Sequence, residues 1–205
     1  KRMGYTPAGY SSVGGSYSFH YPDGNASIAR LLVRLLIPGS IEGHDARDIV
    51  MAKADYSKLD VPGAPVRIRL NQIAVRARNA GKGVDVAYTE AKGGKKVMRV
   101  RAKDCVLASW NMMIPYLVPE LPAAQKAALH KLVKTPLVYT SVALNNWQAF
   151  KKLGIRSVEA PGGYHSSFGL NNPMEIGGYA TPRDPAQPML IRMVRTPAAP
   201  GRRPC

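Results

Sequence analysis

The chain is poor in cysteine, in aromatic residues and in acidic residues. Two cysteines among 205 residues cannot build the framework of several disulfides that stabilises many small secreted domains. The four histidines are dispersed, and none has metal-ligand spacing to a cysteine or carboxylate, so a metal site is not expected. No apolar run reaches eighteen residues and no signal-peptide core is evident, so the sequence predicts no membrane span in this segment and leaves the compartment open.

The shortage of acidic residues gives the chain a strong positive charge. There are 29 Lys and Arg against 13 Asp and Glu, a formal net charge of +16, which suggests nucleic acid or an anionic membrane as a partner. The cations are scattered, however, and no run of five occurs. Aromatic residues make up only 7% and do not interleave with them, as stacking of single-stranded bases would require. We therefore expect no nucleic-acid partner, and keep a stand-alone basic module for an anionic partner as the alternative.

The segment from Phe19 to Arg34 predicts a turn followed by a helix. Pro22, Asp23 and Gly24 are typical of a turn, and Asn25 or Ser27 can accept a hydrogen bond from the free N–H groups of a helix start. The helix should end before the Pro-Gly pair at 38–39. Its apolar residues recur at helical spacing, which predicts one buried face: Ile28, Leu31, Leu32, Leu35 and Leu36.

The middle of the chain changes from a helical to a strand period. After a short helical candidate at 46–60, with Ile49 and Met51 inward, apolar and basic residues alternate in VRIRLNQIAVRAR, GVDVAYTEA and KKVMRVRA. GKG and KGG lie between these segments, at the positions of hairpin turns. The sequence therefore predicts three antiparallel strands with one solvent-exposed, cationic face. The following DCVLASW is continuously apolar, which favours a strand covered on both faces with a buried Cys105.

The last third predicts further helices and strands. A helix should begin at Pro122, in PELPAAQKAALHKLV, and a short one in WQAFKKLG should end at Gly154. Strands are predicted in five segments: LVYTSVALNN, SVEA, YHSSFGL, MEIGGYA and PMLIRMVR.

Four of these segments carry a resemblance to a known family. They are FHYPDGNASIARLLVRLLIPG, VRIRLNQIAVRAR, RVRAKDCVLASWNMMIPYLVPELP and LVYTSVALNNWQAFKKLG. In this order, from about Tyr17 to about Thr196, the chain resembles the middle of bacterial FAD-dependent spermidine dehydrogenase-like proteins of the flavin amine oxidase superfamily.

The resemblance implies a mixed α/β (α+β) fold with two domains. Residues 1–16 would be a loop or frayed end, 17–113 the middle of a Rossmann-like FAD-binding domain, and 114–205 a substrate-binding domain with a mixed or antiparallel sheet. The parent enzyme would oxidise a polyamine or other amine by hydride transfer to FAD. A GxGxxG turn, which holds a dinucleotide pyrophosphate at a helix start, does not occur here, so we expect an inactive internal fragment.

The resemblance also implies which residues meet the cofactor. Ala74 stands where the main chain contacts the adenine edge, and Ala108 and Ser109 where family strands pass close to the flavin. Asn111 can either hydrogen-bond the flavin or cap the next turn. On burial statistics alone, a buried strand residue is the better interpretation of Ala74.

The substrate side of the site is implied in the same way. Many amine oxidases carry a lysine on the central strand of the substrate domain, and LVYTSVAL has none, so Tyr139 is the catalytic candidate in its place. Tyr164 and His165, beside a Gly-Gly turn, are candidate walls of the substrate pocket, and Tyr179 has the same status. The alternative for His165 is a histidine without a role in a pocket, either hydrogen-bonded within the fold or exposed at the surface.

Overall fold

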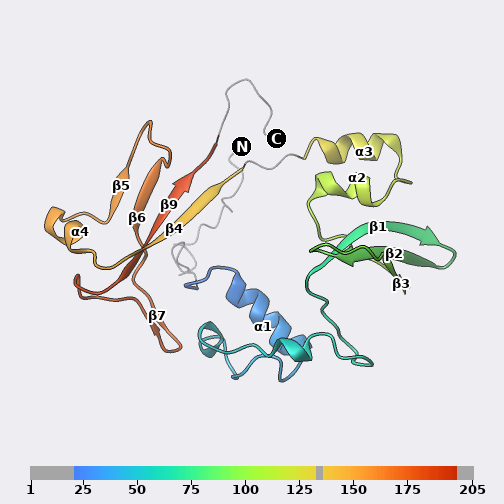
Figure 1. Ribbon diagram of the computed structural model, residues 1–205, viewed down its shortest axis with the longest axis horizontal. Coiled ribbons are helices and arrows are strands. Elements are labelled where there is room, and N and C mark those ends of the chain that lie inside the picture. Colours follow the sequence, from blue (N-terminus) through green and yellow to red (C-terminus); the bar gives the residue numbers. More distant parts are fainter. Residues whose placement is uncertain (1–20, 133–135, 198–205) are drawn as a thin grey trace, which may run out of the picture. The chain divides into compact units, whose positions relative to one another are not determined.

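The computed structural model describes residues 21–132 and 136–197, which form a mixed α/β fold with antiparallel sheets and few helices (Figure 1). This confirms the coarse fold class predicted from the sequence. By compactness the chain divides into two units, each discontinuous in sequence. Within the described residues, the first comprises 21–68, 145–148 and 171–189, and the second the remainder. Residues 1–16, predicted as a loop, lie outside the described residues, and no described helix is long and apolar enough to span a membrane.

In the first unit, helix α1 (Ala26–Leu36) confirms the predicted helix but begins differently. Asn25 makes no side-chain capping bond. Ser27 does not accept from the helix start: its hydroxyl donates to Asp23 at 2.7 Å, and its side chain is fully buried. The turn and the helix are thus joined through a hydroxyl–carboxylate bond, which a charge on the acceptor strengthens.

The apolar face of α1 is not buried as predicted. Leu35 is 76% exposed, and Ile28, Leu32 and Leu36 are each about half exposed. The packed face is instead the one with the arginines, because Arg30 donates to the carbonyl of Ala52, and Arg34 donates to those of Glu42 and Asp45. Amphipathic spacing identified the helix correctly but did not show which face the neighbouring chain covers.

The segment after α1 forms two 3₁₀ turns, η2 (Asp48–Val50) and η3 (Tyr56–Lys58), rather than the predicted short helix. Ile49 is fully buried as expected, whereas Met51 is 60% exposed. Aspartates anchor both turns: Asp55 accepts from the Ser57 N–H at 3.1 Å. The segment therefore folds around carboxylate–backbone bonds and around the buried side chains of Ile41, Ile49 and Leu59.

Asp48 is the centre of that folding. Its carboxylate accepts from the backbone N–H of His44 at 2.5 Å and of Asp45 at 3.1 Å, and pairs with Arg34 at 2.7 Å. The His44 bond is the main cause that lowers the pKa of Asp48 from its usual 3.8 to about 2, with the Asp45 bond and Arg34 adding to it. Gly43 is required here, because it has φ +100° and a Cβ would overlap the Asp48 carboxylate.

We expect Asp48→Asn to lower stability at neutral pH and to flatten its dependence on acid. A carboxyl with a depressed folded-state pKa stabilises the fold fully above its unfolded value, near 3.8, and loses that contribution as pH falls towards about 2. Urea unfolding at pH 7, 4 and 2.5 measures this. Asp104→Asn, at an exposed position, is the control, and parallel acid profiles for both variants would contradict the role of Asp48.

The second unit contains the three predicted antiparallel strands, β1 (Gln72–Ala80), β2 (Gly83–Glu90) and β3 (Met98–Ala102), in the order β1-β2-β3. A bulge interrupts the β1–β2 register between Ala74 and Arg76. One face of the sheet carries Ala77, which is buried, and the short helix α2 (Ile114–Leu117) contacts β1. The turns and the pairing follow the sequence prediction.

The segment after β3 does not follow the prediction. Residues 104–108 form no strand, Cys105 is exposed and Val106 is 89% exposed. The predicted doubly covered strand is therefore wrong for the described structure, since no neighbouring strand pairs with it. A continuous apolar run indicates only a preference for burial, and a strand also needs a partner for its backbone groups.

The remaining elements agree with the predicted types, except that MEIGGYA, predicted as one strand, forms two short strands joined by a turn at Gly177 and Gly178. The helices are α3 (Ala123–His130) and α4 (Gln148–Leu153), with Gly154 at φ +66° after the second. A four-stranded sheet has the order β4-β9-β6-β5, and β7 and β8 form a separate hairpin. The strands are β4 (Val138–Leu144), β5 (Ser157–Glu159), β6 (Ser167–Leu170), β7 (Glu175–Ile176), β8 (Tyr179–Ala180) and β9 (Met189–Arg195).

Candidate functional site

Two of the predicted substrate residues come together with a strand residue in the four-stranded sheet. The hydroxyl of Thr140, on β4, lies 2.8 Å from Nε2 of His165, 25 residues later. Both side chains are half-buried, so this hydrogen bond holds the imidazole in one place while leaving it accessible. His165 is therefore a histidine with one ring nitrogen engaged and Nδ1 available for a further partner.

Tyr164 forms a second wall beside the imidazole. Its ring meets that of His165 edge to face, with centroids 4.9 Å apart at 80°. On its other side the guanidinium of Arg195 lies over the Tyr164 ring at 4.5 Å, and Arg195 also donates to the Tyr164 carbonyl at 2.6 Å. The tyrosine ring is thus fixed by a cation–π contact and an aromatic contact although it is 66% exposed.

The chain presents these residues through a tight connection between β5 and β6. Gly162 takes φ +81°, which side chains disfavour, and the N–H of Gly163 donates to the carbonyl of Ala160 at 3.0 Å. The connection closes where Ala160 N–H donates to Ser166, and Ser166 N–H to Val194 on β9, both at 2.9 Å. The Pro-Gly-Gly sequence therefore places Tyr164 and His165 at the end of a hydrogen-bonded hairpin.

The side chains of this cluster can bind a small polar group. Nδ1 of His165 and the Tyr164 hydroxyl can each donate or accept, and Arg195 supplies a positive charge nearby. Such a set suits a neutral amine, a hydroxyl or a carboxylate, and it disfavours a second cation close to Arg195. Among the described residues no group of three or more His, Cys, Asp or Glu could hold a metal ion.

Tyr139 does not join this cluster. It precedes Thr140 on β4, and side chains of adjacent strand residues point to opposite faces of a sheet. Tyr139 is 63% exposed on its own face. One small substrate therefore cannot contact both Tyr139 and His165, and the two sequence-derived candidates describe different faces of the sheet.

The residues predicted to meet the cofactor are spread over two places. Ala74 lies in β1 next to the bulge, while Ala108 and Ser109 lie in the segment without a strand, and all three are exposed. Asn111 begins the 3₁₀ turn η4 (Asn111–Met113). A cavity of about 120 Å³ beside this segment is lined by Cys105, Leu107, Val118 and others, and by none of these four residues.

The residues present therefore do not fit FAD as a pocket of their own. Their side chains are small and open to solvent, and the sequence has no turn for the pyrophosphate. A flavin in contact with them would have to be held by other residues.

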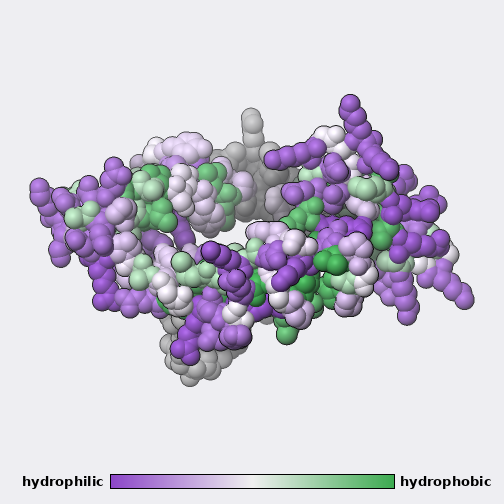
Figure 2. Space-filling view, turned by 60° about the horizontal axis from the view of Figure 1, so that its bottom comes forward, coloured by the Kyte–Doolittle hydropathy of each residue, from purple (hydrophilic) through white to green (hydrophobic). Residues whose placement is uncertain are grey.

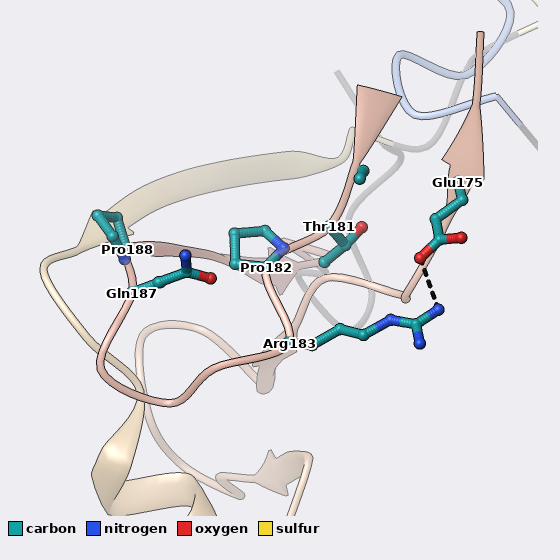
Figure 3. A pocket seen from close by; sticks show the side chains of 7 residues that line it. Glu175, Thr181, Pro182, Arg183, Gln187 and Pro188 are labelled. Carbon is teal, nitrogen blue, oxygen red and sulfur yellow. Dashed lines mark hydrogen bonds and ion pairs between the residues drawn. The ribbon is translucent and has the colours of Figure 1, made fainter. Parts of the chain in front are cut away.

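Tyr179 lies in the first unit, next to a shallow hollow that the sequence did not indicate. It is half-buried on β8, opposite Ile176. The neighbouring hollow, of about 570 Å³, has an ion pair between Glu175 and Arg183 at 2.5 Å on one side (Figure 3). The Thr181 hydroxyl already takes part in a hydrogen bond of the fold, because it accepts from the Met174 N–H at 3.1 Å. Both charged groups are well exposed and satisfy each other, so the hollow offers weak recognition only.

Thr140 and Arg195 were missed by sequence reasoning. Thr140 directly follows Tyr139, the residue that the sequence pointed to on this strand. Arg195 ends the last apolar strand, 31 residues after Tyr164, which it contacts. Only the pairing of β6 with β9 brings Arg195 to the tyrosine, and no local pattern indicates that pairing.

Comparison with known proteins adds no relative. No protein-family model matches the chain, and no curated protein matches it.

Proposed function

We propose that the chain supplies the middle of the FAD-binding domain and most of the substrate-binding domain of an FAD-dependent oxidoreductase similar to spermidine dehydrogenase, acting on a polyamine or another amine. The proposal rests on a resemblance of four long sequence blocks, in the same order between about Tyr17 and about Thr196, to blocks of that family. The mixed α/β fold with antiparallel sheets is compatible with it. FAD would accept the hydride, and the protein would orient the amine.

Within this proposal, the Thr140–His165 pair binds and orients the amine. An amine nitrogen must be neutral to lose hydride from its carbon, and Nδ1 of His165 can hold a neutral amine by a hydrogen bond. Arg195, fixed over Tyr164, disfavours an ammonium group at the same point by like-charge repulsion. The cluster therefore favours the uncharged form of the nitrogen nearest to it.

Two variants of adjacent residues decide which face of β4 the substrate meets. In the flavoprotein encoded by the longer reading frame that we propose, Thr140→Val removes the hydroxyl that holds His165 and should slow anaerobic flavin reduction by spermidine about tenfold, or about 1.4 kcal/mol. Tyr139→Phe, on the other face, should leave the rate unchanged. The reverse result, a slow Tyr139→Phe and a normal Thr140→Val, would return the catalytic role to Tyr139.

A further inference from the structure

The arginines that look scattered in the sequence lie on one face of the β1-β2-β3 sheet. Directly paired residues in antiparallel strands share a face. Ala87 on β2 pairs with Arg76 and with Arg99, and Asp85 pairs with Arg78 and with Arg101. The register therefore places four guanidinium groups in two rows, which the spacing of cations along the chain does not reveal.

The geometry of these rows is regular. The two rows lie two residues apart along each strand, a distance of about 7 Å. Within a row, the arginine on β1 and the arginine on β3 are two strand spacings apart, about 10 Å. The opposite face carries buried Ala77 and Asn79, whose N–H donates to Glu120, whereas among the described residues the four arginine side chains are all exposed. Figure 2 shows hydrophilic side chains projecting on the right of the view, the side on which Figure 1 has this sheet. A depression of about 430 Å³ lies on this face, beside Arg76, Arg78, Asp85 and Arg99.

The positive charge of this face is only partly neutralised. Asp85 is its one carboxylate, and its distances to Arg99 and Arg101 are 3.7 and 3.8 Å, too long for hydrogen bonds. Arg76 and Arg78 make no ion pair or side-chain hydrogen bond within residues 21–132 and 136–197. Residues 72–103 as a whole contain nine Lys and Arg against two Asp and Glu, with lysines in both turns. The face is therefore a strong local source of positive potential.

We propose that this arginine face, defined by Arg76, Arg78, Arg99 and Arg101, binds the phosphate backbone of double-stranded nucleic acid without reading its sequence. Guanidinium groups match phosphate oxygens through paired hydrogen bonds, and the two rows extend along a track with lysines at both ends. The only aromatic residue of the three strands is Tyr88, which lies on the opposite face beneath Arg69. Without a stacking ring, unpaired bases gain nothing here, so a duplex backbone fits better than a single strand.

The test measures binding of the full chain to a fluorescent DNA duplex of mixed sequence, by anisotropy, between about 50 and about 200 mM salt. Because a chain with a net charge of +16 binds DNA weakly wherever it is positive, the comparison uses charge-matched variants. Arg76→Gln/Arg78→Gln removes two cations from the face, and Lys151→Gln/Lys152→Gln removes two from the exposed side of α4.

The first double variant should reduce the slope of log K against log salt by about two, and the second should leave it nearly unchanged. Asp85→Asn should tighten binding about threefold at low salt, because it removes the opposing charge from the row that Arg78 and Arg101 form. Glu90→Gln, which removes a carboxylate paired with Gln72 on the opposite face, should not. Circular dichroism confirms that each variant is folded.

Equal losses for both arginine and lysine double variants would overturn the proposal, as would tightening by Glu90→Gln equal to that by Asp85→Asn. Stronger binding to vesicles of anionic lipid than to the duplex, with the same variants affected, would overturn it in favour of a membrane surface. These outcomes are independent of the flavin proposal, because they measure binding to a duplex or to vesicles and not flavin binding or flavin reduction.

Discussion

Replacing Gly177 by alanine is expected to destabilise the first unit far more than the same change at the next residue. Gly177 and Gly178 form the two-residue turn of the β7–β8 hairpin, with φ of +55° and +84°. Both therefore pay the cost of a left-handed conformation, about 1–2 kcal/mol, when a side chain is added. Only Gly177 lies against another segment of the protein. A Cβ atom on Gly177 would overlap the carbonyl oxygen of Arg47, whereas nothing lies within 4 Å of a Cβ atom on Gly178.

The overlap involves backbone on both sides, so it cannot be relieved by turning a flexible side chain. We expect Gly177→Ala to cost about 1–3 kcal/mol beyond the loss in Gly178→Ala. Urea unfolding followed by fluorescence measures this in a Trp110→Phe background. There Trp147, whose backbone N–H donates to the Pro185 carbonyl in the first unit, is the only tryptophan. Equal losses for the two variants would mean that the hairpin does not rest on the Arg47–Asp48 segment.

The second large effect concerns the cofactor. We expect residues 1–205, purified with added FAD, to leave gel filtration without stoichiometric flavin. The pyrophosphate carries two negative charges, and the chain contains no GxGxxG turn to bring them to a helix start. The residues that the sequence resemblance assigned to the cofactor are small, exposed and spread over two places.

Flavin absorbance of the protein peak measures this directly. Basic patches, including the arginine face, can attract FAD weakly at low salt, so the column is run at about 0.5 M salt, where such attraction is screened. A yellow protein with one flavin per chain under those conditions would show that the chain builds a complete site by a route that its motifs do not reveal.

Local patterns predicted most of the elements because each is specified by neighbouring residues. The GKG turn and the alternation on either side of it specify the β1–β2 hairpin, and Gly154 specifies the end of α4. These features require only the period of the side chains and a glycine in the left-handed region, both of which are visible in sequence.

Burial was predicted less well because it depends on what lies across from a residue. The leucine face of α1 is exposed and its arginine face packs, since carbonyls of the next segment, such as that of Asp45, accept from Arg34. Val106 has strongly apolar neighbours in sequence but no strand beside it. Apolar spacing indicates a preference for burial, and only the tertiary contacts show whether it is met.

The candidate site was predicted in part for the same reason. Tyr164 and His165 were found because a Gly-Gly turn precedes them, which is a local signal. Their partners Thr140 and Arg195 are 25 and 31 residues away from them, so only the pairing of strands brings them into contact. The arginine face was not predicted for the same reason. Each of its rows combines an arginine of β1 with an arginine of β3, and only the pairing of both strands with β2 brings them together.

The most direct test of the proposed function is the nucleotide sequence upstream of the Lys1 codon. If the chain is the middle of an FAD-dependent oxidoreductase, the open reading frame continues and encodes a GxGxxG turn between a strand and a helix, which supplies the missing pyrophosphate site. A start codon close upstream with no such segment would contradict the flavoenzyme assignment and leave the basic binding module as the function of the chain.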